Sequence, residues 1–217
     1  DFSKGIHLQH VADFEFSSNP GESNRIIVFP QYTYQHWIGF GGAFTESAGY
    51  TLSKMSDEKQ NEMIHAYFGE NGIQYNFCRN HINSCDFSLD NYAYIDDEHD
   101  VNFETFDISR DKKYIIPMIK KAQSVSKENI KFLASPWSPP PFMKDTKQMN
   151  RGGKLLSEYR EAWAKYIARY IKEYKKEGIE ISMLTIQNEP NATQTWDSCT
   201  YDALEERDFG THYLVPT

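Results

Sequence analysis

Strand-like and helix-like segments alternate along residues 38–217, and no other feature of the sequence limits the possible folds as strongly. The clearest helix covers 159–174, where aromatic and isoleucine side chains recur every three or four residues with Lys and Glu between them, and Gly178 then ends it. The apolar, strand-like stretches are 37–44, 73–78, 130–134 and 181–186. Such alternation predicts an α/β fold in which a parallel sheet is connected by crossover helices.

Local signals set the limits of the other helices. Ser56 is a suitable N-cap for a helix that ends at Gly69 or Gly72. A second helix begins near 112–114, because Pro117 is tolerated only in a first turn. Asp202, followed three residues later by a glutamate, resembles a capping box that opens one more helix.

The first 37 residues do not follow this alternation. Ile6–Val11 and Ile26–Phe29 have the composition of short strands, and the turn-rich segment 17–21 separates them. We therefore expect two parts: residues 1–37, which contribute strands beside the main domain, and residues 38–217, which form that domain.

Four strand–helix units fit two architectures, a doubly wound sheet and part of a (β/α)₈ barrel. Both place their functional sites at the carboxyl ends of the strands. A barrel needs eight units and about 250 residues, whereas this chain has 217. If the fold is a barrel, we expect its C-terminal half to be absent from this chain.

Composition and motifs exclude several classes of function. A net charge of −8 disfavours nucleic acid as a partner, and no apolar run approaches the roughly 18 residues that a transmembrane helix needs. The three cysteines form no C-x-x-C pair, and the seven histidines show no metal-ligand spacing. The glycines of 39–42 lack the third glycine of a dinucleotide-binding loop. We expect no metal and no cofactor.

The segment Gln187-Asn188-Glu189-Pro190 carries the most specific chemistry, because it follows the fourth predicted strand. A half-buried carboxyl group at that position would have a raised pKa, as a general acid requires. Asn188 offers a donor and an acceptor suited to a sugar hydroxyl. The alternative is that Glu189 only caps the following loop, and spacing alone leaves both open.

The ends of the two preceding strands carry compatible residues. Arg79 follows the second predicted strand, with Asp86 a few residues further on, and Trp137 follows the third. Taken singly, Arg79 fits a buried ion pair and Trp137 fits a core residue. Together, a guanidinium, a carboxylate, an indole and an amide at one edge are typical of a carbohydrate pocket.

Four segments, in this order, resemble glycoside hydrolase family 30, the glucosylceramidase-like retaining β-glycosidases, and the similarity runs from about residue 26 to 217. They are Gly39-Phe40-Gly41-Gly42-Ala43-Phe44-Thr45-Glu46, Ser84-Cys85-Asp86-Phe87-Ser88, Ala134-Ser135-Pro136-Trp137 and Gln187-Asn188-Glu189-Pro190. The resemblance implies a (β/α)₈ barrel flanked by a β-sandwich, to which the strands within residues 1–37 would belong.

The resemblance also implies roles for individual residues. Glu189 would be the general acid/base and Asn188 would hold the sugar 2-hydroxyl. Asp86 and Trp137 would bind the far hydroxyls, while Arg79 would lie close to the nucleophile. With less support from the motifs, Phe87 and Trp196 would line the pocket.

The second carboxyl group is the missing part of this assignment. Retaining hydrolysis needs two carboxyl groups about 5–5.5 Å apart, and the family places the nucleophile, a glutamate, on the seventh barrel strand. That strand would lie beyond Thr217. Glu46 follows the first strand, and nothing in its spacing supports the role. We therefore expect the isolated chain to be inactive and to need the missing C-terminal half of the barrel as its partner.

The resemblance implies an exo-acting β-glucosidase of the glucosylceramidase type, acting on a carbohydrate or glycolipid. Two alternatives stay open: an endo-β-1,6-glucanase of the same family, and a truncated, non-catalytic sugar-binding protein. A doubly wound nucleotide binder is disfavoured because the phosphate loop is absent. The resemblance, together with a sequence that begins at Asp1 and not at Met, favours a secreted or extracytoplasmic location.

Overall fold

A computed structural model describes residues 2–4, 27–100 and 102–217, and its internal contacts divide the chain into two units, Asp1–Trp37 and Ile38–Thr217. In the first unit, the predicted strand Ile6–Val11 lies outside the described residues. Residues 27–29, from the second predicted strand, are irregular and not extended in a ladder. A strand persists only where a neighbouring strand pairs with its backbone, and no described strand pairs with 27–29. Their place in a β-sandwich stays a prediction.

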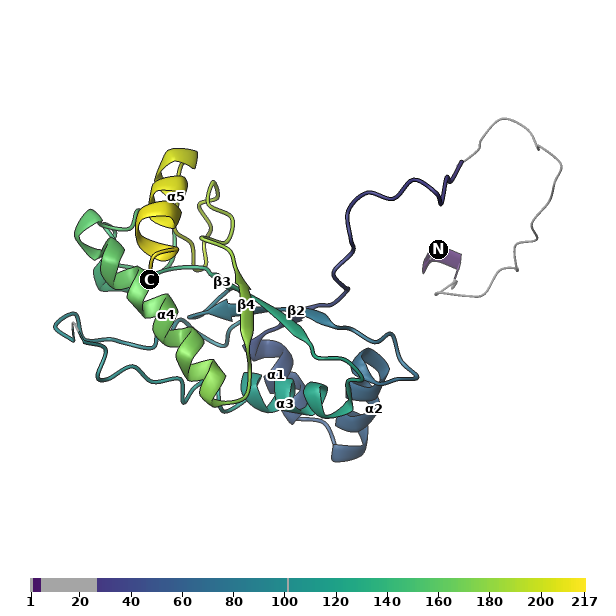
Figure 1. The fold of residues 1–217 in the computed structure, drawn as a ribbon. Coiled ribbons are helices and arrows are strands. Elements are labelled where there is room, and N and C mark those ends of the chain that lie inside the picture. The colour runs from purple at the N-terminus through teal and green to yellow at the C-terminus, as the bar shows by residue number, and fades with distance from the viewer. Residues whose placement is uncertain (1, 5–26, 101) are drawn as a thin grey trace. The chain divides into compact units, whose positions relative to one another are not determined.

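The second unit contains a four-stranded parallel sheet (Figure 1). Its strands lie in chain order, β1-β2-β3-β4, and every neighbouring pair is parallel. The strands are β1 (Ala43–Phe44), β2 (Phe77–Ile82), β3 (Lys131–Pro136) and β4 (Ile181–Leu184). A doubly wound sheet would reverse its strand order at a switch point. The uninterrupted order is therefore that of a barrel segment.

Two strands differ from the prediction by more than two residues, whereas β3 and β4 differ from it by one or two. The segment 37–44 was expected to be one strand, yet only Ala43–Phe44 joins the ladder. β2 was expected at 73–78 and instead begins at Phe77, because the backbone of Ile73 and Tyr75 is hydrogen-bonded to the end of the preceding helix. As a result Arg79 lies inside β2 and does not follow its end.

Three helices follow the predicted limits closely. Helix α2 (Asp57–Phe68) has Ser56 as its N-cap and ends at Gly69. Helix α3 (Ile115–Val125) carries Pro117 in its first turn. Helix α5 (Ala203–Phe209) opens with the capping box of Asp202 and Glu205, and the π-helix η4 (Gly210–Leu214) continues it.

Helix α1 (Glu46–Ser53) was not predicted, because it is short and only weakly amphipathic; Thr45 is its N-cap. Helix α4 (Arg160–Lys176) is the long helix expected from the aromatic spacing, and Gly178 follows it with a φ of 78°. Helix α3 packs against α1 and α2, and α4 runs along β4 (Figure 1). The remaining described elements are three short 3₁₀ helices, η1 (Phe2–Lys4), η2 (Pro141–Met143) and η3 (Ser157–Tyr159).

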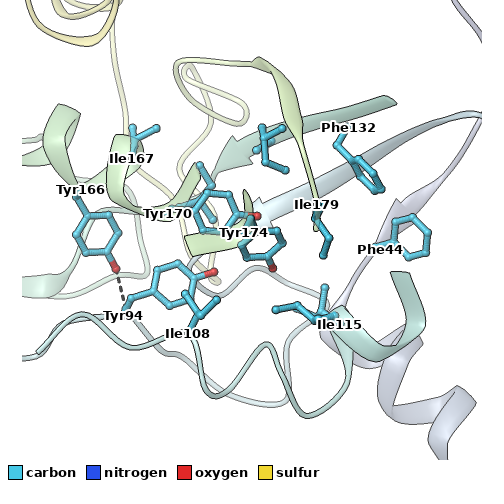
Figure 2. Packing of buried hydrophobic residues seen from close by; sticks show 14 of the residues in the cluster. Phe44, Tyr94, Ile108, Ile115, Phe132, Tyr166, Ile167, Tyr170, Tyr174 and Ile179 are labelled. Atoms are coloured by element: carbon cyan, nitrogen blue, oxygen red, sulfur yellow. Dashed lines mark hydrogen bonds between the residues drawn. The ribbon is translucent and has the colours of Figure 1, made fainter. Parts of the chain in front are cut away.

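The core between α4 and the sheet is rich in tyrosine (Figure 2). Tyr166, Tyr170 and Tyr174 of α4 are fully buried, and the Tyr166 hydroxyl accepts a hydrogen bond from the backbone N–H of Tyr94 at 2.7 Å. Tyrosine supplies a large apolar ring and a hydroxyl that can satisfy buried polar groups. This layer therefore attaches the segment after β2 to α4.

Candidate active site

Polar side chains of β2, β3 and the segment after β4 meet through hydrogen bonds. The Arg79 guanidinium of β2 donates to Ser135 Oγ of β3 at 2.9 Å, and Thr185, just after β4, donates to the same oxygen at 2.7 Å. Arg79 also donates to Asn188 Oδ1 at 2.8 Å. Arg79 is thus the centre of the site. Neither Ser135 nor Thr185 was assigned a role from the sequence, although Ser135 lies within one of the matching segments.

The loop after β4 is held against the end of β3 by one backbone and one side-chain hydrogen bond. Asn188 N–H donates to the Pro136 carbonyl at 2.8 Å, and the Gln187 amide donates to the Trp137 carbonyl at 2.8 Å. Glu189 then adopts a left-handed conformation, with φ 46°. A non-glycine residue in this region is uncommon and is often found at functional sites. These bonds keep Asn188 and Glu189 beside the carboxyl end of β3.

The expectation that Glu189 is half-buried is wrong, because its side chain is exposed. Its carboxylate accepts a hydrogen bond from the Gln194 amide at 3.3 Å, and Gln194 had not been singled out from the sequence. Among the described residues, the Gln194 amide is the hydrogen-bond partner of this carboxylate, and the loop leaves the carboxylate open to solvent.

Trp137 and Asp86 are joined directly. The indole Nε1–H donates to Asp86 Oδ1 at 3.1 Å, and the Arg79 guanidinium carbon lies 4.6 Å from the centre of the Trp137 ring. A cation over an aromatic face is attracted by the ring quadrupole. One face of the indole is therefore occupied by Arg79, and the indole N–H is engaged by Asp86.

The charged groups of the site influence one another electrostatically. Burial lowers the pKa of the Arg79 guanidinium, and the acidic groups of Cys85, Glu189 and Asp86 oppose this effect. Arginine still carries its charge at neutral pH, because its pKa starts far above that range. Arg79 therefore supplies a fixed positive charge that interacts electrostatically with the Asp86 and Glu189 carboxylates.

Two of the predicted pocket residues form no hydrogen bond to Arg79, Asn188, Trp137 or Asp86 in the part of the chain that the structure describes. Phe87 is exposed and lines a groove beside β1, α1 and α2. Trp196 is partly exposed, and its carbonyl accepts a hydrogen bond from the Arg151 N–H. Both stay predictions as pocket residues, since a bound sugar could extend toward them.

Glu46 is buried and bound to Arg110 through two hydrogen bonds, of 2.7 and 3.0 Å. A carboxylate engaged in this way is not free to act as a nucleophile. Among the described residues, no group of three or more His, Cys, Asp or Glu side chains could hold a metal ion. Within the same residues, no helix is long and apolar enough to cross a membrane.

Parallel strands in chain order, with polar side chains gathered at their carboxyl ends, define the first part of a (β/α)₈ barrel of the kind that carries enzymatic sites. The model of the Glycosyl hydrolase family 30 TIM-barrel domain matches residues 37–217. The chain belongs to glycoside hydrolase family 30, which confirms both the resemblance and the barrel fold.

Similar proteins span more than this chain. Putative glucosylceramidase 3 of Caenorhabditis elegans is 40% identical, over 84% of this chain and 36% of its own length. The crystal structure of SrfJ from Salmonella typhimurium has 43% identity and a TM-score of 0.83, over 86% of this chain and 42% of SrfJ. The endo-β1,6-glucanase BT3312 has 31% identity and a TM-score of 0.80, over 86% of this chain and 43% of its own. The chain thus spans about two fifths of the length of these relatives.

Proposed function

We propose that this chain supplies the acid/base half of the active site of a retaining glycoside hydrolase that cleaves β-linked glucosides. The network of Arg79, Asn188, Trp137 and Asp86, with Glu189 beside it at the carboxyl ends of adjacent barrel strands, carries the proposal. The family supports the same chemistry, because a pair of carboxyl groups suffices for glycoside hydrolysis without a metal or cofactor.

In this mechanism Glu189 gives a proton to the glycosidic oxygen while a second carboxylate attacks the anomeric carbon. The leaving group departs and a covalent glycosyl–enzyme ester forms. Glu189, now a carboxylate, takes a proton from water, and the hydroxide that results displaces the second carboxylate. Asn188 would hold the 2-hydroxyl and Asp86 with Trp137 the far hydroxyls, so that the ring is oriented for both steps.

The nucleophile is proposed to come from the part of the barrel that this chain does not contain. Four strands in chain order leave β1 and β4 as the edges of the described sheet, and a barrel needs further strands to close it. The same addition would cover the exposed side of Glu189. Burial there would raise the pKa of its carboxyl group toward the value that a general acid needs.

The proposal is tested in a completed enzyme, which we define as this chain joined to the part of Putative glucosylceramidase 3 beyond the matched region. Glu189→Gln should lower kcat on an aryl β-glucoside by about 10²–10⁴-fold, the usual contribution of a general acid/base. Glu180→Gln is the matched control, because Glu180 is exposed just before the amino end of β4. Equal activity of Glu189→Gln and the parent would contradict the assignment of Glu189. Turnover by residues 1–217 alone would contradict the proposal that the nucleophile lies outside this chain.

A glucosylceramidase-type exo-β-glucosidase is the first candidate, since a nematode relative carries that name at 40% identity. The structural similarity to the endo-β1,6-glucanase BT3312 supports the second candidate. Product analysis with the completed enzyme distinguishes them. Glucose released from glucosylceramide favours the first, and internal cleavage of β-1,6-glucan favours the second.

A non-catalytic sugar-binding protein is the third candidate, because Asp86, Trp137 and Asn188 could bind a sugar without turnover. It predicts that residues 1–217 bind β-glucosides in isothermal titration and that Asp86→Asn abolishes the binding.

An extracytoplasmic location is also proposed, because glycolipids and polysaccharides are encountered there. Detection of the native protein in the cytosolic fraction alone would contradict it.

A further inference from the structure

The loop that carries Asp86 is held by an ion-paired cluster of Glu46, Arg110 and Asp90, which we call the clamp. The loop runs from Ser84 to Tyr92, and it is closed at its base because Ser84 N–H donates to the Tyr92 carbonyl at 3.0 Å. Asp86 itself is exposed near the tip. Its position therefore depends on what holds residues 87–90.

Helix α1 provides that support through its first residues. The backbone N–H of Ser47 donates to the Phe87 carbonyl at 2.9 Å, and the Glu46 carboxylate accepts the backbone N–H of Leu89 at 2.8 Å. These two bonds bracket the residues that directly follow Asp86. Glu46 is thus in contact with the loop backbone and is 2% exposed.

Arg110 completes the clamp from the segment before α3. Its guanidinium binds Glu46 through two nitrogens, at 2.7 and 3.0 Å, and also pairs with Asp90 of the loop. Its guanidinium carbon lies 4.2 Å from the centre of the Tyr92 ring, at the base of the loop. Bidentate pairs of this kind fix direction as well as distance.

The backbone N–H of Glu46 connects the clamp to His81 and, through that ring, to Trp137. It donates to His81 Nε2 at 3.3 Å, and the His81 ring lies edge-to-face with Trp137, 6.3 Å between centres. Trp137 is the residue that donates to Asp86. Glu46 therefore contacts the loop backbone through its carboxylate and His81, the neighbour of Trp137, through its own backbone N–H.

We propose that Glu46, paired with Arg110, is a positioning residue that holds Asp86 where it receives the Trp137 N–H and binds the far hydroxyls of the sugar. The inference rests on the proposed function, because it assigns Asp86 to sugar binding. Glu46 acts through Asp86 and does not touch the substrate.

The test measures kinetics of the completed enzyme with an aryl β-glucoside. Glu46→Gln keeps the size of the side chain but replaces one accepting oxygen by an NH₂ group. That group cannot accept a hydrogen bond from Arg110 or from the Leu89 N–H, so the loop should become more mobile. KM should rise about tenfold with kcat changed less than about threefold, the pattern expected when ground-state and transition-state binding are lost together. Glu177→Gln is the control, because Glu177 also binds two cationic side chains, at 2.8 and 2.9 Å, away from the loop.

A double-mutant cycle separates positioning from a general loss of stability. Asp86→Asn alone should raise KM, and adding Glu46→Gln should raise it little further, because both changes remove the same interaction. If the two substitutions raise KM by independent factors that multiply, the inference is overturned.

The Trp137 indole N–H resonance gives a second readout. Glu46→Gln should accelerate its hydrogen exchange, and unchanged exchange would count against the clamp.

Two further outcomes keep the inference and the proposed function apart. If Asp86→Asn leaves KM unchanged, the sugar-binding role of Asp86 has failed. If Asp86→Asn raises KM and folded Glu46→Gln does not, only the clamp has failed. Should Glu46→Gln not fold, Arg110→Lys replaces it, because lysine keeps the charge and cannot bind Glu46 and Asp90 together through a planar fork. The same KM increase is then expected, and its absence overturns the clamp.

Discussion

Asp111 is a fully buried carboxylate that accepts hydrogen bonds from three tyrosine hydroxyls. Tyr92, Tyr94 and Tyr174 donate to its two oxygens at 2.9, 2.7 and 2.7 Å. A buried charge is tolerated when its lone pairs are satisfied in this way. Arg110 and Asp111 are adjacent, so one dipeptide attaches the Asp86 loop to α1 on one side and to α4 on the other.

Tyr174→Phe should therefore destabilise the completed enzyme by about 2 kcal/mol, the usual cost of removing a hydrogen bond to a charged group. Tyr201→Phe is the matched control, since the Tyr201 hydroxyl is buried and no described residue is hydrogen-bonded to it. That control should change the free energy of unfolding little or increase it. Equal losses in urea unfolding of the two variants would contradict the argument.

Glu177 predicts an acid-dependent loss of stability. Hydrogen bonds from Lys112 and Lys120 hold the pKa of its carboxyl group at about 2, below the ordinary 4.5. A pKa lowered in the folded state stabilises the protein above pH 4.5, and that stabilisation is lost as the pH falls toward about 2. The parent should exceed Glu177→Gln in free energy of unfolding by less than about 1 kcal/mol near pH 6, as for other surface ion pairs. This difference should disappear near pH 2, and a difference independent of pH would refute it.

The first strand is kept short by a close backbone approach. A Cβ atom at Gly41 would lie 1.7 Å from the Phe77 carbonyl oxygen, whereas one at Gly42 would meet Tyr75 Cε2 at an ordinary 3.8 Å. The Phe40 carbonyl accepts hydrogen bonds from the N–H groups of Asn76 and Phe77. The glycines thus let residues 39–42 run against the start of β2.

Gly41→Ala should consequently cost about 3 kcal/mol or more, because the obstacle is backbone and cannot rotate away. Gly42→Ala should cost less than about 1 kcal/mol, since its new methyl group has room. Thermal unfolding of both variants measures the difference. Comparable stability of the two would show that the β1–β2 approach is not tight.

At the scale of the molecule, residues 38–217 expose apolar side chains on the flank of β1. A groove of about 720 Å³ is lined by β1, α1 and α2, and Met63 and Tyr67 on its rim are 37% and 44% exposed. Exposed apolar surface and an open strand edge both favour association. The remaining strand–helix units of a barrel would cover this flank.

Residues 1–217 expressed alone should therefore self-associate at micromolar concentration, as measured by sedimentation velocity. Replacing both Met63 and Tyr67 by Glu should shift the chain toward the monomer, because charge is costly in an apolar contact. Leu204→Glu is the control, on an exposed position of α5 outside the groove. A monomeric parent at all concentrations would contradict the prediction.

The limits of the helices and strands could be predicted from the sequence to different degrees. Ser56, Pro117 and Asp202 act on their nearest neighbours, and the helices they begin or limit lie where local signals place them. β2 was displaced, because the residues before it bond to the end of α2 and not to a strand. Helix α1 was missed, since its buried residues are few and its stabilising contacts come from Phe87 and Arg110.

The sequence by itself determined the alternating elements, the parallel sheet, the family and the four segments that carry the candidate site. Each of these depends on periodicity, capping or motif order, and all three can be read directly from the order of the residues. Only the tertiary structure decided that Arg79 lies within β2, that Glu189 is exposed and that Glu46 is engaged with Arg110. The side-chain hydrogen bonds of Arg79 and the pairing of Glu46 with Arg110 join residues 56 to 109 positions apart, and the free energy of such contacts is set by packing that no local pattern encodes.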